Sequence, residues 1–236
     1  MTTYAVNINM DQSTVKDLSA NNYKLYGFKA VQTTANGSPL VWFSTSAFSL
    51  NTYISWDVLY NAYTSKSVIK PNTKIVASAA YQIDLRQTLN VTDKSGTGTV
   101  DSGSGVTGAI SIHNLIDDPF TCGISQSDPS GTPTPMCAFP LFGGGLDVIA
   151  PIEKVLFMFA TDQINTGTVI EKAFSRGVLV DLTGAPGNTR SVFFDINKGW
   201  SWNGEPWAKQ VPATSNLTPL LIENSAELSR ARIEAM

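Results

Sequence analysis

Three tryptophans near the C-terminal end are the residues whose type and spacing point most directly to chemistry. Trp200, Trp202 and Trp207 lie within the nine-residue segment GWSWNGEPW, and they are three of the five tryptophans in the chain. Between them stands Asn203-Gly204, the dipeptide most favoured in two-residue type I′ hairpins, because both central residues need a positive φ. The sequence therefore predicts a hairpin whose turn is Asn203-Gly204.

In that hairpin Trp202 would lie opposite Glu205, and Trp200 opposite Trp207. Alternate residues of a strand share a face, so all three indoles and Glu205 would project from one side. Such a face suits a glycan or another flat ring, because indoles give a large contact area at a small entropic cost. The predicted ligand-binding residues are Trp200, Trp202, Trp207, Asp195, Asn197, Asn203 and Glu205. Tryptophan is highly buried on average, however, which slightly favours the alternative that the three indoles belong to the core.

The remaining reactive residues do not form a recognisable site. His113 is the only histidine, which excludes a multi-histidine metal site and argues against a serine–histidine nucleophile pair. The glycines of residues 143–145 are not followed by Lys-Ser or Lys-Thr, so they do not form a phosphate-binding loop. We therefore predict no catalytic residues, no metal ligands and no cofactor.

Charge and hydropathy limit the classes of partner and the compartment. The formal net charge is −3, so the chain lacks the basic surface that nucleic-acid binding requires. No apolar run approaches the ~20 residues of a membrane span, and the first residues lack the pattern of a signal peptide. We expect a cytoplasmic protein in which Cys122 and Cys137 are reduced thiols.

Composition and periodicity favour β-structure. Charged residues make up only 15% of the chain, and Ser, Thr, Asn and Gly replace the Lys and Glu that amphipathic helices need. Residues 11–22 fit a short helix or polar loop, and residues 94–108 and 125–135 fit surface loops. Residues 152–160 are the strongest core candidate. The expected strands are residues 4–8, 23–31, 40–44, 53–63, one or two within 74–91, 152–160, 168–183, 190–197 and 217–223.

These elements predict one all-β domain. We expect a single β-sandwich, or flattened barrel, of about nine to eleven strands over residues 1–222. A helical tail would follow over residues 223–236, with Ser225 as its N-cap.

The predicted function is non-enzymatic recognition, in a lectin-like or toxin-like module that binds a glycan or a ring-bearing small molecule. One alternative is a cofactor-free enzyme whose carboxylates, Asp57, Asp84 and Asp195, act with tyrosines in a sandwich cleft. A second alternative is a structural protein that self-associates into a homo-oligomer through its aromatic edge. Residues 94–112 also allow a membrane-inserting β-segment, although their glycines favour a surface loop.

Overall fold

The computed structural model describes residues 2–103 and 105–235, and strands dominate it. Strands account for 48% of the residues and helices for 11%, so the predicted all-β fold with a short C-terminal helix is confirmed. The strands form three sheets packed in a sandwich-like arrangement, and one sheet curls into a half-barrel. Among the described residues, no helix is long and apolar enough to cross a membrane.

The first sheet has the strand order β17-β16-β1-β5. Its strands are β1 (Thr3–Asn9), β5 (Asn51–Asp57), β16 (Thr189–Asp195) and β17 (Gly199–Ser201). β1 runs parallel to β16 and antiparallel to β5. The strand predicted over residues 4–8 forms, and its burial alternates from residue 6 to residue 9, since Val6 and Ile8 are buried while Asn7 and Asn9 are partly exposed.

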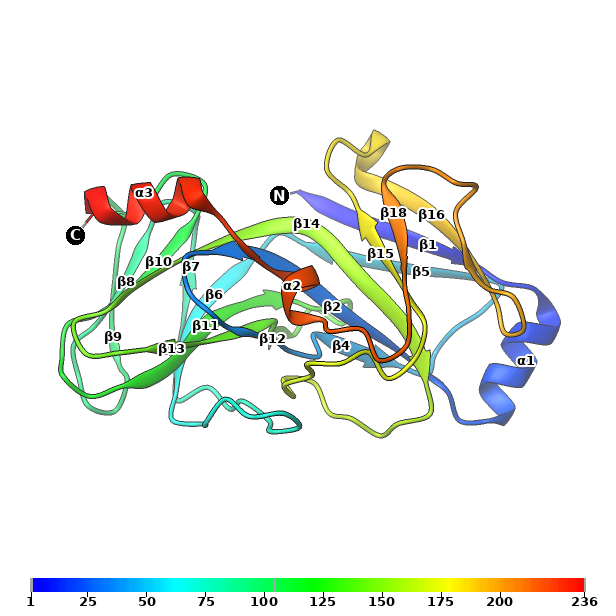
Figure 1. Cartoon of the computed structure of the whole chain (residues 1–236), viewed down its shortest axis with the longest axis horizontal. Coiled ribbons are helices and arrows are strands. Elements are labelled where there is room, and N and C mark those ends of the chain that lie inside the picture. The colour runs from blue at the N-terminus through cyan, green and yellow to red at the C-terminus, as the bar shows by residue number, and fades with distance from the viewer. Residues whose placement is uncertain (1, 104, 236) are drawn as a thin grey trace.

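The second sheet is the largest and is built on two long strands that cross the middle of the molecule (Figure 1). These are β2 (Lys24–Thr33) and β14 (Leu146–Ala160), which pair with each other in antiparallel fashion. Residues 155–160 of β14 are all buried, which confirms most of the core segment predicted over residues 152–160, whereas residues 152–154 are partly exposed. The other strands are β4 (Phe43–Thr45), β8 (Thr88–Val91), β9 (Gly98–Asp101), β10 (Ile110–Asn114), β15 (Gly177–Asp181), β18 (Ala208–Val211) and β19 (Ile222–Asn224).

The third sheet has the order β3-β13-β11-β6-β7, with β12 paired to β11. Its strands are β3 (Ser38–Pro39), β6 (Tyr60–Ser65), β7 (Ala79–Ile83), β11 (Phe120–Ser127), β12 (Pro133–Pro135) and β13 (Cys137–Leu141). β11 is buried along its whole length. Cys122 on β11 and Cys137 on β13 are buried free thiols.

The two longer helices, α1 (Gln12–Ala20) and α3 (Ala226–Ala235), lie at opposite ends of the molecule, and the short α2 (Thr218–Leu221) lies near its middle (Figure 1). α1 begins where Asp11 accepts a hydrogen bond from the backbone N–H of Thr14. α3 begins after Ser225, whose Oγ accepts from the N–H of Leu228 at 3.2 Å, as predicted for its cap. The single turn of α2 and the 3₁₀ helix η1 (Pro186–Asn188) complete the helices among the described residues.

Several predicted boundaries are wrong, mainly because short strands join regions expected to be loops. Residues 125–127 belong to β11 and residues 133–135 to β12, so only residues 128–132 form the predicted surface loop, and β9 lies inside the 94–108 tract. Ser104 of that tract lies outside the described residues. The expected strand over residues 53–63 is two strands, β5 and β6, which belong to different sheets. Residues 218–221 are helical because Pro219 occupies the first turn of α2, where a missing N–H costs nothing.

Candidate functional site

The predicted turn at Asn203-Gly204 forms as expected. Asn203 has a φ of 58° and Gly204 a φ of 74°, and the N–H of Glu205 donates to the carbonyl of Trp202 at 3.3 Å. Two consecutive positive φ angles closed by such a bond are the features of a type I′ turn.

The hairpin predicted around that turn is wrong. β17 ends at Ser201 and pairs with β16, whereas β18 begins at Ala208 and pairs with β15 in another sheet. Trp200 is therefore not opposite Trp207, and the cross-strand pairing that would have placed the three indoles on one hairpin face does not form. The chain makes its hairpin one turn earlier, between β16 and β17.

That earlier hairpin is closed by Asp195 and Gly199. Asp195 Oδ1 accepts from the backbone N–H groups of Asn197 at 2.8 Å and Lys198 at 2.9 Å, and Gly199 has a φ of 84°. The loop between these two paired residues is three residues long, residues 196–198, and a short loop next to a left-handed glycine is a common hairpin connection. The sequence signal for this hairpin is Asp195 followed four residues later by Gly199. It lies close to the more conspicuous turn signal Asn203-Gly204.

Trp200 belongs to the core. It is 6% exposed, its Nε1 donates to the carbonyl of Arg176 at 3.2 Å, and its ring stacks on Phe159 with centroids 5.5 Å apart. Phe194, its cross-strand neighbour, lies 4.7 Å away between centroids on the same inner face. Trp202 and Trp207 are half-buried and pack against the main core cluster. The Trp207 ring also lies 5.0 Å from the Arg190 guanidinium carbon, in a cation–π contact.

The outer face of the first sheet presents a different set of side chains. Cross-strand partners point to the same side of a sheet, so the strand register places two rows of residues on this face. None of them is buried and none is charged. We call this surface the amide face, and it comprises Asn7, Tyr53 and Ser191 in one row and Asn9, Asn51, Phe193 and Ser201 in the next.

A hollow of about 620 Å³ lies at the end of the amide face where β1 leads into α1. Phe193 is 42% exposed and is the exposed aromatic side chain of its lining. The residues that surround it are Asn9, Met10, Asp11, Phe193, Phe194, Asp195, Lys198, Gly199, Trp200, Ser201 and Asn203. The hollow thus brings together three of the predicted site residues, Trp200, Asp195 and Asn203, although the Trp200 indole faces the core.

The other predicted residues do not line this hollow. Asn197 is in the exposed loop between β16 and β17, and Glu205 is in the exposed turn after Gly204. Trp202 and Trp207 lie against the core instead. Phe193, Asn9 and Asp11 are lining residues that the sequence did not predict.

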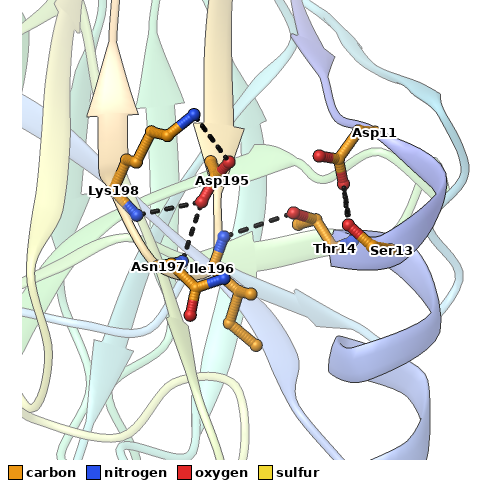
Figure 2. A network of polar contacts seen from close by, with 7 residues as sticks. All are labelled: Asp11, Ser13, Thr14, Asp195, Ile196, Asn197 and Lys198. Carbon is orange, nitrogen blue, oxygen red and sulfur yellow. Dashed lines mark hydrogen bonds and ion pairs between the residues drawn. The ribbon is translucent and has the colours of Figure 1, made fainter.

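A polar network fixes the rim of the hollow (Figure 2). The backbone N–H of Ile196 donates to Thr14 Oγ1 at 3.3 Å, which ties the β16–β17 loop to α1. Backbone N–H donation from Lys198 and Asn197 lowers the pKa of Asp195, and donation from Thr14 lowers the pKa of Asp11. Both carboxylates are therefore ionised at neutral pH, and both belong to loops whose positions are set by hydrogen bonds.

The carboxylates of the enzyme alternative do not converge. Asp57 lies beside Thr3 at the start of β1, and its Oδ1 accepts from Thr3 Oγ1 at 2.6 Å. Asp195 lies beyond Asn9, at the other end of the same sheet, so about 20 Å of strand separates them. Asp84 lies in the turn after β7 of another sheet.

A buried ion pair is the other cluster of ionisable side chains that stands out. Lys29 is fully buried, and its Nζ lies 3.0 Å from Glu153 Oε2, whose side chain is 16% exposed. The ammonium lies 4.6 Å from the ring centroid of Trp56 and 5.7 Å from that of Trp42. Glu153 occupies the register shift of β14 between Ile152 and Val155, and such a bulge re-aims a side chain. Because the ammonium has no exposed surface, we interpret this cluster as structural.

Comparison with known proteins adds no functional information. No protein-family model matches the chain, and no curated protein or solved structure matches it. Within residues 2–103 and 105–235, no three His, Cys, Asp or Glu side chains gather as metal ligands. A function must therefore be argued from the amide face and its hollow.

Proposed function

We propose that the protein is a non-enzymatic recognition module that binds a glycan, or a ring-bearing small molecule rich in hydroxyl groups, at the hollow beside Phe193. The observation that carries this proposal is an exposed phenyl ring surrounded by amides, hydroxyls and ionised carboxylates on an uncovered sheet face. Binding sites commonly combine an apolar surface with a few placed polar groups.

The polar groups match the hydrogen-bonding needs of a sugar. An asparagine amide both donates and accepts, as a hydroxyl does, and Asn9 and Asn203 supply such groups at the hollow. Asp11 and Asp195 accept strongly because they are ionised, and a charge-assisted hydrogen bond is about twice as strong as a neutral one. Phe193 offers an apolar surface on which the carbon-bound hydrogens of a ring can pack.

The loop geometry supports binding without large rearrangement. Asp195 is held by two backbone donors and Asp11 by the first turn of α1, so their positions are set before a ligand arrives. A rigid site loses less entropy on binding than a mobile one. In this proposal Trp200 supports the site from the core side of the sheet, because its stacking on Phe159 holds β17 against the core.

The test compares two phenylalanine variants. A glycan array identifies a bound glycan for the wild-type protein, and calorimetry then measures its affinity for each variant. Phe193→Ala should weaken binding by about 1–3 kcal/mol, which is roughly 5- to 150-fold, with little change in melting temperature. Phe142→Ala is the matched control, because Phe142 is 68% exposed in the turn between β13 and β14, outside the lining of the hollow.

Two results would contradict the proposal. One is an array on which the wild-type protein binds no glycan. The other is a bound glycan whose affinity falls equally in the Phe193 and Phe142 variants, because binding would then take place elsewhere.

A further inference from the structure

The hydrogen-bonding pattern between β1 and β5 determines which backbone groups of β5 face away from β1. Two bonds flank the β1–β5 ladder, from the N–H of Met10 to the carbonyl of Leu50 at 2.8 Å and from the N–H of Val58 to the carbonyl of Thr2 at 2.9 Å. In an antiparallel pair, residues alternate between bonding to the partner and facing away from it. Residues 52, 54 and 56 therefore bond to β1, and residues 51, 53, 55 and 57 turn their N–H and C=O groups to the other side.

At the two ends of β5, the backbone carbonyls that face away from β1 already accept hydrogen bonds. The carbonyl of Asn51 accepts from Ser49 Oγ at 3.1 Å, and the carbonyl of Asp57 accepts from the N–H of Leu59 at 3.0 Å. Between them, the outward N–H and C=O groups of Tyr53 and Ser55 have no hydrogen-bond partner among the described residues. These two residues form a short open edge with the spacing of an antiparallel ladder.

This edge lacks the features by which proteins usually prevent strand addition. Natural edge strands carry lysine, proline or a bulge for that purpose. β5 has the sequence NTYISWD and a regular register, whereas Lys209 lies on β18, Pro39 on β3 and Pro133 on β12. The open edge of β5 is thus chemically suited to accept a strand.

A groove of about 600 Å³ lies beside residues 51–54 of β5 and so reaches this edge at Tyr53. Phe43, Phe48 and Ile54 provide its apolar surface, and hydroxyl groups provide most of the rest. No lysine or arginine lines it, and its one carboxylate, Asp128, already accepts from Ser130 N at 2.8 Å, Thr132 N at 3.1 Å and Thr134 Oγ1 at 3.2 Å. A charged occupant would find no complementary charge, so the lining favours an uncharged one.

We infer that the open edge of β5 binds an extended, uncharged polypeptide segment, which adds to the first sheet as a strand. Its backbone bonds to the N–H and C=O groups of Tyr53 and Ser55, and alternate side chains lie on the Ile54 side, over the apolar lining of the groove. Asp128, Pro129, Ser130 and Thr166 also line the groove, so the space beside β5 is bounded. That boundary favours a single strand over the whole sheet of a second copy.

The probe is a seven-residue peptide of alternating threonine and valine, acetylated and amidated so that it carries no charge. Calorimetry measures its binding to the full chain, and hydrogen–deuterium exchange follows the amides of Tyr53 and Ser55. We expect both amides to exchange fast without peptide and to slow at least tenfold when it is bound, because each gains a backbone acceptor.

A proline variant and an alanine variant of Ser55 form the matched pair. Ser55→Pro removes an outward N–H and places a ring on the edge, yet it costs no bond to β1 because that N–H faces away from β1. We expect it to weaken peptide binding at least tenfold, whereas Ser55→Ala keeps the N–H and should change binding less than twofold. Circular dichroism and a thermal melt verify that both variants are folded.

Peptide methylation separates edge pairing from binding by side chains alone. N-methylation of every second residue blocks one edge of the peptide strand, and methylation of the other residues blocks the opposite edge. We expect one methylated series to lose binding and the other to keep it. Equal binding by both series, or no binding of the unmodified peptide, would overturn the proposal. A third result would also overturn it. If the wild-type protein forms dimers in sedimentation without peptide, and Ser55→Pro disrupts these dimers, the occupant of the edge is a second copy of the chain.

Discussion

At the scale of single residues, the most unusual environment is that of Lys29. A lysine with no exposed surface is rare unless it is paired, and within residues 2–103 and 105–235 this one forms an ion pair with Glu153. Burial lowers the pKa of Lys29, while the carboxylate of Glu153 acts in the opposite direction. The two tryptophan rings beside the ammonium provide part of the stabilisation that water would otherwise give.

We predict that substituting Glu153 and substituting Lys29 lower the free energy of unfolding by different amounts. Glu153→Gln leaves a buried ammonium without a counterion and should cost about 3–5 kcal/mol of unfolding free energy. Lys29→Met leaves a carboxylate that is 16% exposed and can reach water, so it should cost less. The double variant should be more stable than Glu153→Gln alone. Urea unfolding followed by tryptophan fluorescence measures all three.

The pH dependence provides a second readout for the same pair. Because the pKa of Lys29 is lowered in the folded protein, the unfolded chain binds more protons between the folded value and the ordinary value near 10.5. Stability contributed by this group therefore rises with pH through that window. Glu153→Gln should show a steeper rise than the wild type, and Lys29→Met should show none from this position. Equal slopes in all three proteins would mean that Lys29 is solvated.

At the scale of elements, the hairpin between β16 and β17 shows what a local sequence signal can and cannot predict. The Asn203-Gly204 turn follows from the conformational freedom of two residues, so the sequence predicted it correctly. The partner of each flanking strand depends on distant residues, because β17 pairs within the first sheet and β18 joins β15 of the second. The sequence contains two turn signals, one beginning at Asp195 and one at Asn203, and nothing local indicates which of them closes a hairpin.

Gly199 allows the β16–β17 hairpin to be tested separately from its surroundings. A Cβ at this position would meet nothing within 4 Å, so only the φ of 84° opposes a larger residue. We predict that Gly199→Ala costs about 1 kcal/mol of unfolding free energy. Gly103→Ala is the control, since Gly103 has no positive φ and its Cβ would make an ordinary contact at 3.7 Å. Equal melting temperatures for the two variants would contradict this explanation.

At the scale of the whole molecule, periodicity predicted the class of fold and several elements, but it could not predict how the strands form sheets. β1, the core of β14 and the capped C-terminal helix were predictable because their signals lie within a few residues. The neighbours of β1 lie about 50 and 185 residues away in the chain, as in Val6 with Ile54 and Arg190. Such pairings have no local signal in a single sequence.

The candidate site follows the same division. Asp195 and Asn203 were predicted from the polar residues near the tryptophans, and both line the hollow. Phe193 and Asn9 were not predicted, because they meet only through the parallel pairing of β1 with β16. The Trp200 indole lies in the core, which is the alternative that the sequence slightly favoured, and its orientation depends on whether Phe194 or Trp207 is its cross-strand neighbour.

The boundary of the C-terminal tail is a property of the whole fold and can be tested by truncation. α3 is held mainly by Leu228, which is buried against a small cluster that includes Val106, Leu146 and Val148. The preceding β19 pairs with residues 31–33 of β2 and buries Ile222. The predicted boundary at residue 222 therefore cuts through a strand that belongs to the second sheet.

We predict that a chain ending at Ser225 stays folded and loses about 2 kcal/mol, the contribution of one buried leucine with its small neighbour Ala231. Its uncovered sheet surface should bind the dye ANS more strongly than the full chain does. A chain ending at Leu221 also loses the β19 ladder and buried Ile222, so it should be less stable by a further 2 kcal/mol or more, roughly. Urea unfolding of the three lengths measures both steps. If the two truncated chains were equally stable, β19 would contribute nothing to the second sheet, and the tail would begin near residue 223, as the sequence predicted.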